Sequence, residues 1–184
     1  MIRLLDIFLA FISLVFLSPI IIFLYLLIFL ENNSPFFRQV RVGKNLKDFT
    51  LIKFRTMKIG TESCATHLVD STRITKLGRI LRKTKLDEIP QLFNVLKGEM
   101  SFVGPRPCLP NQIQLIETRK KYNLYRYTPG ITGLSQIMGI DMSKPVLLSK
   151  TDDKMMRNFS LLKYFYYIAL TLLVSGFGDR VRNI

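Results

Sequence analysis

The sequence has very few of the side chains that build zinc sites and disulfide frameworks. Its 184 residues include two cysteines, Cys64 and Cys108, and a single histidine, His67. Structural zinc sites need about four Cys or His ligands, so neither a zinc site nor a disulfide framework is supported. Two free thiols agree with a reducing cytosol. No catalytic partner stands near His67, so we expect it on a solvated loop.

Acidic residues are also scarce. The chain carries 27 Lys and Arg against 13 Asp and Glu, which gives a net charge of +14. Only Arg3 and Asp6 are charged before Glu31, so an apolar N-terminal segment precedes a strongly basic body. Such a body suits nucleic acid, an anionic membrane surface or phosphorylated substrates. The apolar segment and the lack of a nucleic-acid-binding motif argue against nucleic acid.

The apolar segment, residues 7–30, is long enough to meet a membrane. As one helix it would rise about 36 Å, enough to span the hydrocarbon core. Pro19 removes one backbone hydrogen bond, so we expect a kink, and Ser18 can satisfy the freed carbonyl. Two topologies stay open: a kinked helix that crosses the bilayer, or a helix–break–helix hairpin that returns to the same face. Basic residues on both flanks favour the hairpin if both ends prefer the cytoplasmic side.

Two adjacent carboxylates, Asp87 and Glu88, stand before a predicted helix. Pro90 fits the first turn of that helix, and Gly98 is a natural stop. A helix start offers unpaired N–H groups and the positive end of the dipole, which suit anions. A rigid turn then brings back Arg106, whose guanidinium binds phosphate oxygens in bidentate fashion. Carboxylates and fixed cations in one short segment suggest phosphate chemistry.

A structural alternative explains the same carboxylates. Thr84 and Asp87 have the spacing of a capping box, and Glu88 would then be an ordinary first-turn charge. Spacing alone does not decide between the two interpretations.

The rest of the body predicts short elements. Residues 35–57 read as a β-hairpin around a turn at 43–45, with Lys53 and Arg55 on one face of the second strand. On its own, such a face is usually solvated. Residues 73–83 form a basic helix-like stretch, and residues 109–125 an amphipathic helix rich in Lys and Arg. A second apolar run, 159–174, suits either the membrane interface or a packed core.

A long stretch of this sequence resembles a known family. The string LDEIPQLFNVLKGEMSFVGPRP, residues 86–107, is similar to the signature of the bacterial sugar transferases that load a phospho-sugar onto polyprenyl phosphate, the monotopic phosphoglycosyl transferases. Shorter matches surround Lys53, Arg82 and the Pro-Gly-Ile-Thr-Gly-Leu motif at 129–134. The Ser18-Pro19 pair also matches, so the resemblance favours the re-entrant hairpin.

The resemblance implies a reaction and a set of roles. A phospho-sugar would move from a UDP-sugar to undecaprenyl phosphate with release of UMP, as the first membrane step of surface glycan assembly. Asp87 would be the nucleophile and Glu88 its helper, with Mg²⁺ held by both. The residues expected to contact substrate, mainly its phosphates, are Lys53, Arg55, Arg82, Arg106 and Asp152.

Four positions depart from the family pattern. Thr128 stands where an Arg is usual, and Met138 and Ile140 stand where an Asn and an Arg are usual. Tyr164 replaces a family Asp. These departures weaken the carry-over of the nucleotide-sugar contacts and suit a different sugar.

The expected fold is α+β and mainly helical. Residues 1–31 would form a re-entrant membrane hairpin, and residues 32–184 a membrane-associated catalytic domain with a short β-hairpin and interfacial amphipathic helices. The expected location is the bacterial inner membrane, with the active site on its cytoplasmic face and anionic lipid as a partner. The alternative function is a non-catalytic basic scaffold on the membrane surface. The sequence leaves the sugar and the oligomeric state open, a homo-oligomer included.

Overall fold

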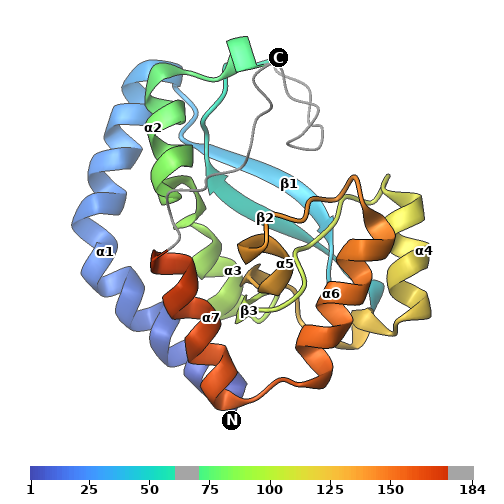
Figure 1. The fold of residues 1–184 in the computed structure, drawn as a ribbon. Helices are drawn as coiled ribbons and strands as arrows, with labels where there is room; N and C mark the ends of the chain where they lie inside the picture. Colours follow the sequence, from blue (N-terminus) through green and yellow to red (C-terminus); the bar gives the residue numbers. More distant parts are fainter. Residues whose placement is uncertain (61–70, 174–184) are drawn as a thin grey trace.

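The computed structural model describes residues 1–60 and 71–173, so Cys64 and His67 lie outside the described part (Figure 1). The helices are α1 Ile2–Asn32, α2 Lys76–Thr84, α3 Gln91–Lys97, α4 Ile113–Lys121, α5 Leu134–Ile137, α6 Pro145–Arg157 and α7 Leu161–Leu173. The strands are β1 Phe36–Val42, β2 Asp48–Phe54, β3 Ser101–Val103 and β4 Gly130–Thr132. Single 3₁₀ turns are η1 Lys44–Leu46, η3 Ser71–Arg73, η4 Leu86–Glu88 and η5 Leu124–Arg126. The prediction of a mainly helical α+β fold is confirmed.

Helix α1 continues through the Ser18-Pro19 pair. Proline at position 19 leaves the carbonyl of Val15, four residues earlier, without its helical donor. The hydroxyl of Ser18 donates to this same carbonyl at 2.8 Å, as the sequence predicts. The helix therefore keeps its course and curves along one side of the molecule instead of dividing into two (Figure 1). Its topology in a bilayer stays a prediction.

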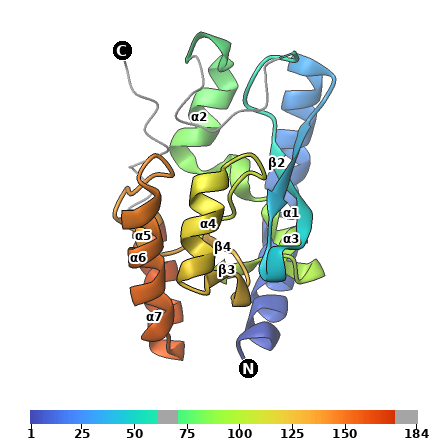
Figure 2. The same ribbon diagram turned by 90° about the vertical axis from the view of Figure 1, so that its right-hand side faces the viewer.

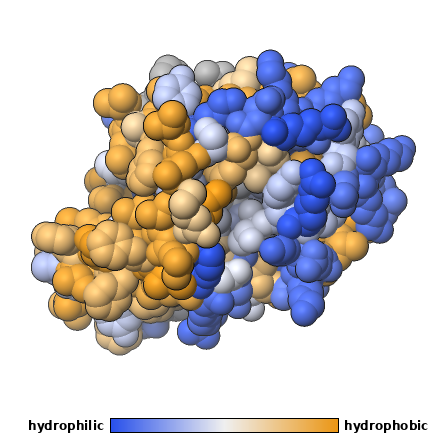
Figure 3. Space-filling model, turned by 90° about the horizontal axis from the view of Figure 1, so that it is seen from below, coloured by the Kyte–Doolittle hydropathy of each residue, from blue (hydrophilic) through white to orange (hydrophobic). Residues whose placement is uncertain are grey.

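One face of α1 packs on the body and the rest is bare. The helix is long and apolar enough to cross a membrane, and only 11% of its most apolar window is buried. Its exposed large side chains include Leu4, Phe8, Phe11, Val15, Phe16, Ile22, Phe23, Leu26 and Leu30. Seen from below, apolar residues gather on one side of the molecule and hydrophilic residues on the other (Figure 3). Exposed apolar area of this kind marks a membrane-contacting or protein-contacting surface.

Helix α7 combines the two interpretations of the second apolar run. Tyr164 and Tyr167 are buried and pack in a cluster with Val103. Leu162 and Leu173 lie on the same helix but are almost fully exposed. The helix is therefore a core element with an apolar outer face, which is typical of helices at an interface.

The two small sheets differ in how local they are. Strands β1 and β2 pair antiparallel with Phe37 opposite Lys53, which confirms the predicted hairpin. Strands β3 and β4 pair in parallel, although 26 residues separate Val103 from Gly130, and the sequence analysis did not predict them. Figure 2 shows this pair behind α4, between α1, α3 and the hairpin on one side and α5, α6 and α7 on the other.

Two predicted helices are confirmed with changed limits. The basic stretch forms α2, which Thr75 caps by accepting a hydrogen bond from the Gly78 amide at 2.9 Å. Helix α4 is shorter than the 109–125 expected and ends near Asn123, whose left-handed backbone (φ 52) breaks the helix. Helix α6 was not anticipated at all.

Candidate active site

The acidic pair lies in the η4 turn between α2 and α3. Asp87 is buried, whereas the side chain of Glu88 is 20% exposed. The expectation that the pair lies at the start of α3 is wrong by one turn, because Pro90 occupies the position that precedes that helix. Gly98 ends α3 with φ 86, as predicted.

The capping-box alternative is wrong. Thr84 is the last residue of α2, and its hydroxyl donates back to the carbonyls of Ile80 at 2.9 Å and Leu81 at 3.2 Å. Lys85 then adopts a left-handed conformation (φ 57) and turns the chain into η4. Thr84 therefore belongs to a helix end, and the carboxylates that follow are not explained by capping.

Lys53 and Glu88 meet across the contact between β2 and η4. The Nζ atom of Lys53 is 2.5 Å from Oε1 of Glu88. Asn94, fully buried on α3, ties β2 to the helix that follows η4: its carboxamide accepts from the Ile52 amide at 3.1 Å and donates to the Thr50 carbonyl at 2.7 Å. The free edge of β2 is thus satisfied by a side chain, which brings the strand's lysine to the acidic turn.

A shallow surface cavity opens beside this ion pair. Its lining residues are Arg41, Leu51, Lys53, Glu88, Gln91, Arg106, Pro107, Gly130 and Ile131. Lys53, Glu88 and Arg106 therefore converge, as the sequence predicts. Arg41 joins them, although the sequence analysis did not single it out. Cations from distant segments on one wall are suited to bind phosphate groups.

The turn that carries Arg106 is fixed by close backbone packing. A Cβ atom on Gly130 would lie 2.0 Å from the Gly104 amide nitrogen, and one on Gly104 would lie 2.4 Å from the Thr128 carbonyl oxygen. Only glycine fits at these two positions. The close approach lets the Gly130 amide donate to the Pro105 carbonyl at 3.0 Å.

Asp152 does not lie at the surface with the cations. It is fully buried on α6, where its Oδ2 accepts from Nη2 of Arg119 at 2.9 Å and its Oδ1 accepts from the Ser135 hydroxyl at 2.5 Å. Burial raises the pKa of the Asp152 carboxyl, and the Arg119 guanidinium and the Ser135 hydroxyl oppose that rise. Arg119, which the sequence analysis missed, is itself buried and donates from Nη1 to the Arg106 carbonyl at 2.7 Å.

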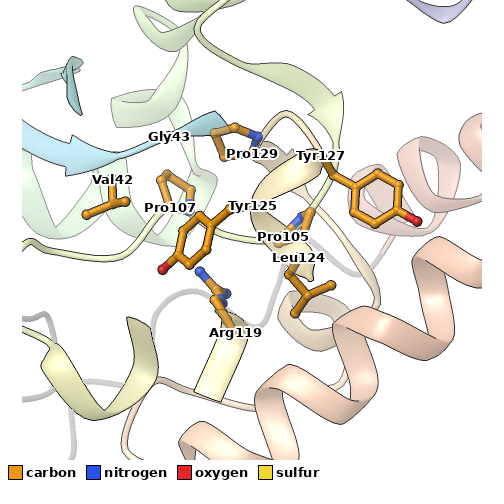
Figure 4. Close-up of a pocket in the computed structure, with 9 residues that line it drawn as sticks. All are labelled: Val42, Gly43, Pro105, Pro107, Arg119, Leu124, Tyr125, Tyr127 and Pro129. Atoms are coloured by element: carbon orange, nitrogen blue, oxygen red, sulfur yellow. The ribbon is translucent and has the colours of Figure 1, made fainter. Parts of the chain in front are cut away.

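A second shallow cavity lies against the same turn (Figure 4). Its lining residues are Val42, Gly43, Pro105, Pro107, Arg119, Leu124, Tyr125, Tyr127 and Pro129. Arg119 and Tyr125 point toward each other in Figure 4. The Tyr125 hydroxyl is 3.4 Å from the Cys108 sulfur, and burial is the main cause of its raised pKa. Pro107 lines both cavities, so the turn separates them.

Two other predicted cations have partners away from the first cavity. Arg55 donates to the Ser34 carbonyl at 2.9 Å and to the Phe36 carbonyl at 3.1 Å, which fixes the segment after α1. Arg82 donates from Nε to the Thr56 hydroxyl at 2.9 Å. The structure gives both a structural role, and their contact with substrate stays a prediction.

The first turn of α1 is tied to the site's framework by polar contacts. Arg3 donates to the carbonyls of Val95 at 2.5 Å and Leu96 at 2.7 Å, at the end of α3. Asp6 is buried and accepts from the Ser101 hydroxyl at 2.9 Å and the Tyr164 hydroxyl at 2.8 Å. Tyr164, one of the departures from the family pattern, thus supplies a donor to a buried carboxylate.

The other departures divide between core and surface. Ile140 packs against the cluster of Val42, Cys108, Leu115 and Leu148, whereas Met138 is exposed. An arginine at position 140 would have to leave this cluster.

Oxygen donors for a divalent cation are present at Asp87 and Glu88. Among the described residues, no three His, Cys, Asp or Glu side chains gather as a metal cage. Mg²⁺ does not need such a cage, because it is usually bound by one or two carboxylates together with substrate phosphates and water. The donor set therefore fits Mg²⁺, with Lys53 already held at one oxygen of Glu88.

These features define a class of protein. A long apolar helix with a bare outer face is joined to a body that presents the Glu88 carboxylate and three fixed cations in one cavity. This combination describes a membrane-associated protein equipped for phosphate chemistry.

Comparison with known proteins gives the family. A family model described as bacterial sugar transferase matches residues 1–177, and the chain belongs to this family. It is 47% identical over 138 residues to the uncharacterized sugar transferase EpsL of Bacillus subtilis (strain 168). The matched region covers 74% of this chain and 68% of EpsL. Several of its relatives are named as transferases, so the predicted family and enzyme class are confirmed.

Two relatives with more specific names are longer proteins. The chain is 34% identical to the UDP-N-acetylgalactosamine-undecaprenyl-phosphate N-acetylgalactosaminephosphotransferase of Aeromonas hydrophila, over 95% of this chain and 44% of that protein. It is 35% identical to the undecaprenyl-phosphate galactose phosphotransferase of Salmonella typhimurium, over 74% of this chain and 32% of that protein. The chain thus spans less than half of these two relatives.

Proposed function

We propose that this protein transfers a phospho-sugar from a UDP-sugar to polyprenyl phosphate and releases UMP. The carrying observation is the cavity in which Glu88, next to Asp87, faces Lys53, Arg41 and Arg106. Two relatives are named for transfer of a sugar phosphate to undecaprenyl phosphate, which supports the choice of acceptor. The apolar face of α1 suits a lipid acceptor.

Asp87 is the nucleophile of this proposal. One of its carboxylate oxygens attacks the phosphorus that bears the sugar, the bond from that phosphorus to the UMP oxygen breaks, and UMP leaves with the bonding electrons. A phosphate oxygen of the polyprenyl phosphate then attacks the aspartyl phospho-sugar and returns the carboxylate. Two displacements replace one difficult transfer, and a carboxylate needs no deprotonation at neutral pH. The burial of Asp87 limits loss of the intermediate to water.

The cations neutralise the phosphates that must approach this carboxylate. Arg106 offers a planar fork to two phosphate oxygens, and Arg41 and Lys53 offer charge from the opposite strand pair. Lys53 exchanges Glu88 for a phosphate oxygen at little cost, because both side chains reach solvent. Mg²⁺, held by Asp87 and Glu88, would supply further charge neutralisation on the phosphates.

The proposed location is the cytoplasmic face of the bacterial inner membrane, with α1 as a re-entrant element. The family resemblance at Ser18-Pro19 and the basic flanks of α1 support this topology, although α1 runs unbroken through the pair in the structure. Single cysteines at position 2 and after Glu31 should both be labelled from the cytoplasm only. A residue 2 that reacts from outside would establish a spanning helix instead. Replacing Ser18-Pro19 with Ala-Leu should favour that spanning form.

A turnover assay tests the function directly. Detergent-solubilised protein is incubated with Mg²⁺, undecaprenyl phosphate and a panel of UDP-sugars, and UMP is measured. We expect continuous UMP release with at least one sugar. Without the lipid phosphate, UMP release should stop at about one UMP per enzyme, and without Mg²⁺ it should be lost. Binding to anionic vesicles without any turnover across the panel would favour the non-catalytic scaffold.

A further inference from the structure

The polar chain behind the Arg106 turn is not used by the chemistry above. Arg119 on α4 joins Asp152 on α6 to the carbonyl of Arg106, and Ser135 on α5 completes the carboxylate's partners. Arg119 and Asp152 are 2% and 0% exposed, so neither reaches a substrate in the first cavity. A chain of hydrogen bonds from three helices therefore ends, through Arg119, at one backbone atom of the residue that carries the phosphate-binding fork.

The turn cannot hold this carbonyl by itself. Pro105 and Pro107 lack N–H groups, so the segment has few main-chain donors of its own. Gly104 donates to the Thr132 carbonyl at 2.9 Å and anchors the turn to β4 on one side. Beyond that anchor, Arg41 binds the Pro107 carbonyl at 3.1 Å and Arg119 binds the Arg106 carbonyl at 2.7 Å.

Stability alone is a poor reason to keep a buried ion pair. An apolar pair of similar volume is often as stable or more stable, because it avoids the desolvation of two charges. An apolar pair cannot donate to a carbonyl, however. An apolar replacement would therefore lose the hydrogen bond that Arg119 donates to the Arg106 carbonyl.

We propose that Arg119 and Asp152 are positioning residues for Arg106. Asp152 orients the guanidinium of Arg119. Arg119 in turn fixes the position of the Arg106 carbonyl, and hence the direction of the Arg106 side chain. This inference rests on the proposed function, in which that side chain binds a phosphate of the reacting group. A displacement of about 1 Å at such a contact costs roughly 10²-fold in rate.

The test uses a double variant that removes the pair without leaving a buried charge. Arg119→Met/Asp152→Leu should fold and bind membranes like wild type, since the charges leave together. We expect kcat to fall roughly 10²-fold with a smaller change in KM. The matched control is Arg157→Met/Asp153→Leu, which removes the neighbouring ion pair of 2.8 Å on α6 and should leave kcat unchanged.

A mutant cycle with Arg106→Ala separates positioning from a general loss of structure. If Arg119 and Asp152 act through Arg106, the double variant should change kcat by less than about twofold in the Arg106→Ala background. An equal loss of kcat in both backgrounds would overturn the proposal.

Hydrogen exchange provides a readout that needs no activity. Amides of Gly104, Arg106 and Cys108 should exchange faster in the double variant but not in the control, while α1 is unchanged. Unchanged exchange in this peptide would refute the positioning role even in a protein without turnover. Absence of turnover in wild type would instead refute the proposed function, so the two failures are distinct.

Discussion

The Lys53–Glu88 pair and the Arg119–Asp152 pair join the same kinds of charge in different surroundings. The side chains of the first pair are 16% and 20% exposed, whereas those of the second are 3% and 0% exposed. A pair that reaches water exchanges its partner for a ligand at small cost, because solvent screens the intermediate states. A buried pair cannot, because a desolvated charge without its partner is costly.

This contrast sorts the predicted site residues by role. Lys53, Glu88 and Arg106 line a cavity and are placed to touch a ligand. Asp152 shares the same likeness to the family but acts, by our inference, through Arg119 and the backbone. Similarity to the family therefore identified the candidate site residues, and their burial separates those that can touch a ligand from those that cannot.

The largest effect is expected at the nucleophile. Asp87→Asn should lower turnover roughly 10⁴-fold or more, because an amide cannot carry the covalent phospho-sugar. Labelled UDP-sugar, added without polyprenyl phosphate, should label the peptide that contains Asp87 in wild type and not in the variant. Glu88→Gln, the matched control, should slow turnover or weaken its Mg²⁺ dependence and still allow labelling. Robust turnover by Asp87→Asn would end this mechanism.

Breaking each ion pair on one side sharpens the comparison. Arg119→Met leaves Asp152 buried without its cation and should lower the free energy of unfolding by about 3–5 kcal/mol. Lys53→Met should change it by about 1 kcal/mol or less while lowering turnover. Denaturant titration of both variants measures the difference. Equal losses in the free energy of unfolding would show that the two ion pairs contribute equally to stability.

The next effect concerns the guanidinium fork. Arg106→Lys keeps the charge but loses the bidentate geometry, so turnover should fall roughly tenfold or more without loss of stability. Steady-state UMP release and a thermal unfolding curve measure the two quantities. Wild-type turnover would mean that the side chain serves the turn alone.

The smallest effect is expected where α7 meets α1. Tyr164→Phe removes one donor to Asp6, which keeps the Ser101 hydroxyl and the Phe102 amide. The cost should be about 1 kcal/mol in the free energy of unfolding. Tyr164→Asp should cost more, since it would place a second carboxylate beside the first. If Tyr164→Asp and Tyr164→Phe lowered the free energy of unfolding equally, the contact between residue 164 and Asp6 would not be the cause.

The local sequence pattern predicted several helices and strands, whereas tertiary contacts decided which of them pack together. The hairpin, the basic helix α2 and the stop at Gly98 follow from spacing, turn residues and helix ends, and all are confirmed. The start of α3 was misplaced by one turn because a 3₁₀ turn and an α-helix begin alike in sequence.

The interior of the site was out of reach for a different reason. The parallel pairing of β3 and β4 depends on glycines 26 residues apart that fit together only in the folded chain. Asn94 read as an ordinary helix residue, although it supplies both a donor and an acceptor to the edge of β2. Periodicity carries no signal for such long-range polar partners.

By itself, the sequence determined the apolar α1, the basic body and the acidic pair with its neighbouring cations, because each depends on the order of nearby residues. Only the tertiary structure decided that Lys53, Arg41 and Arg106 share a cavity while Asp152 and Arg119 stand behind it. The physical reason is that a charged side chain with access to water can bind a ligand, whereas a buried one can only orient its neighbours. The packing of distant segments decides which side chains keep that access.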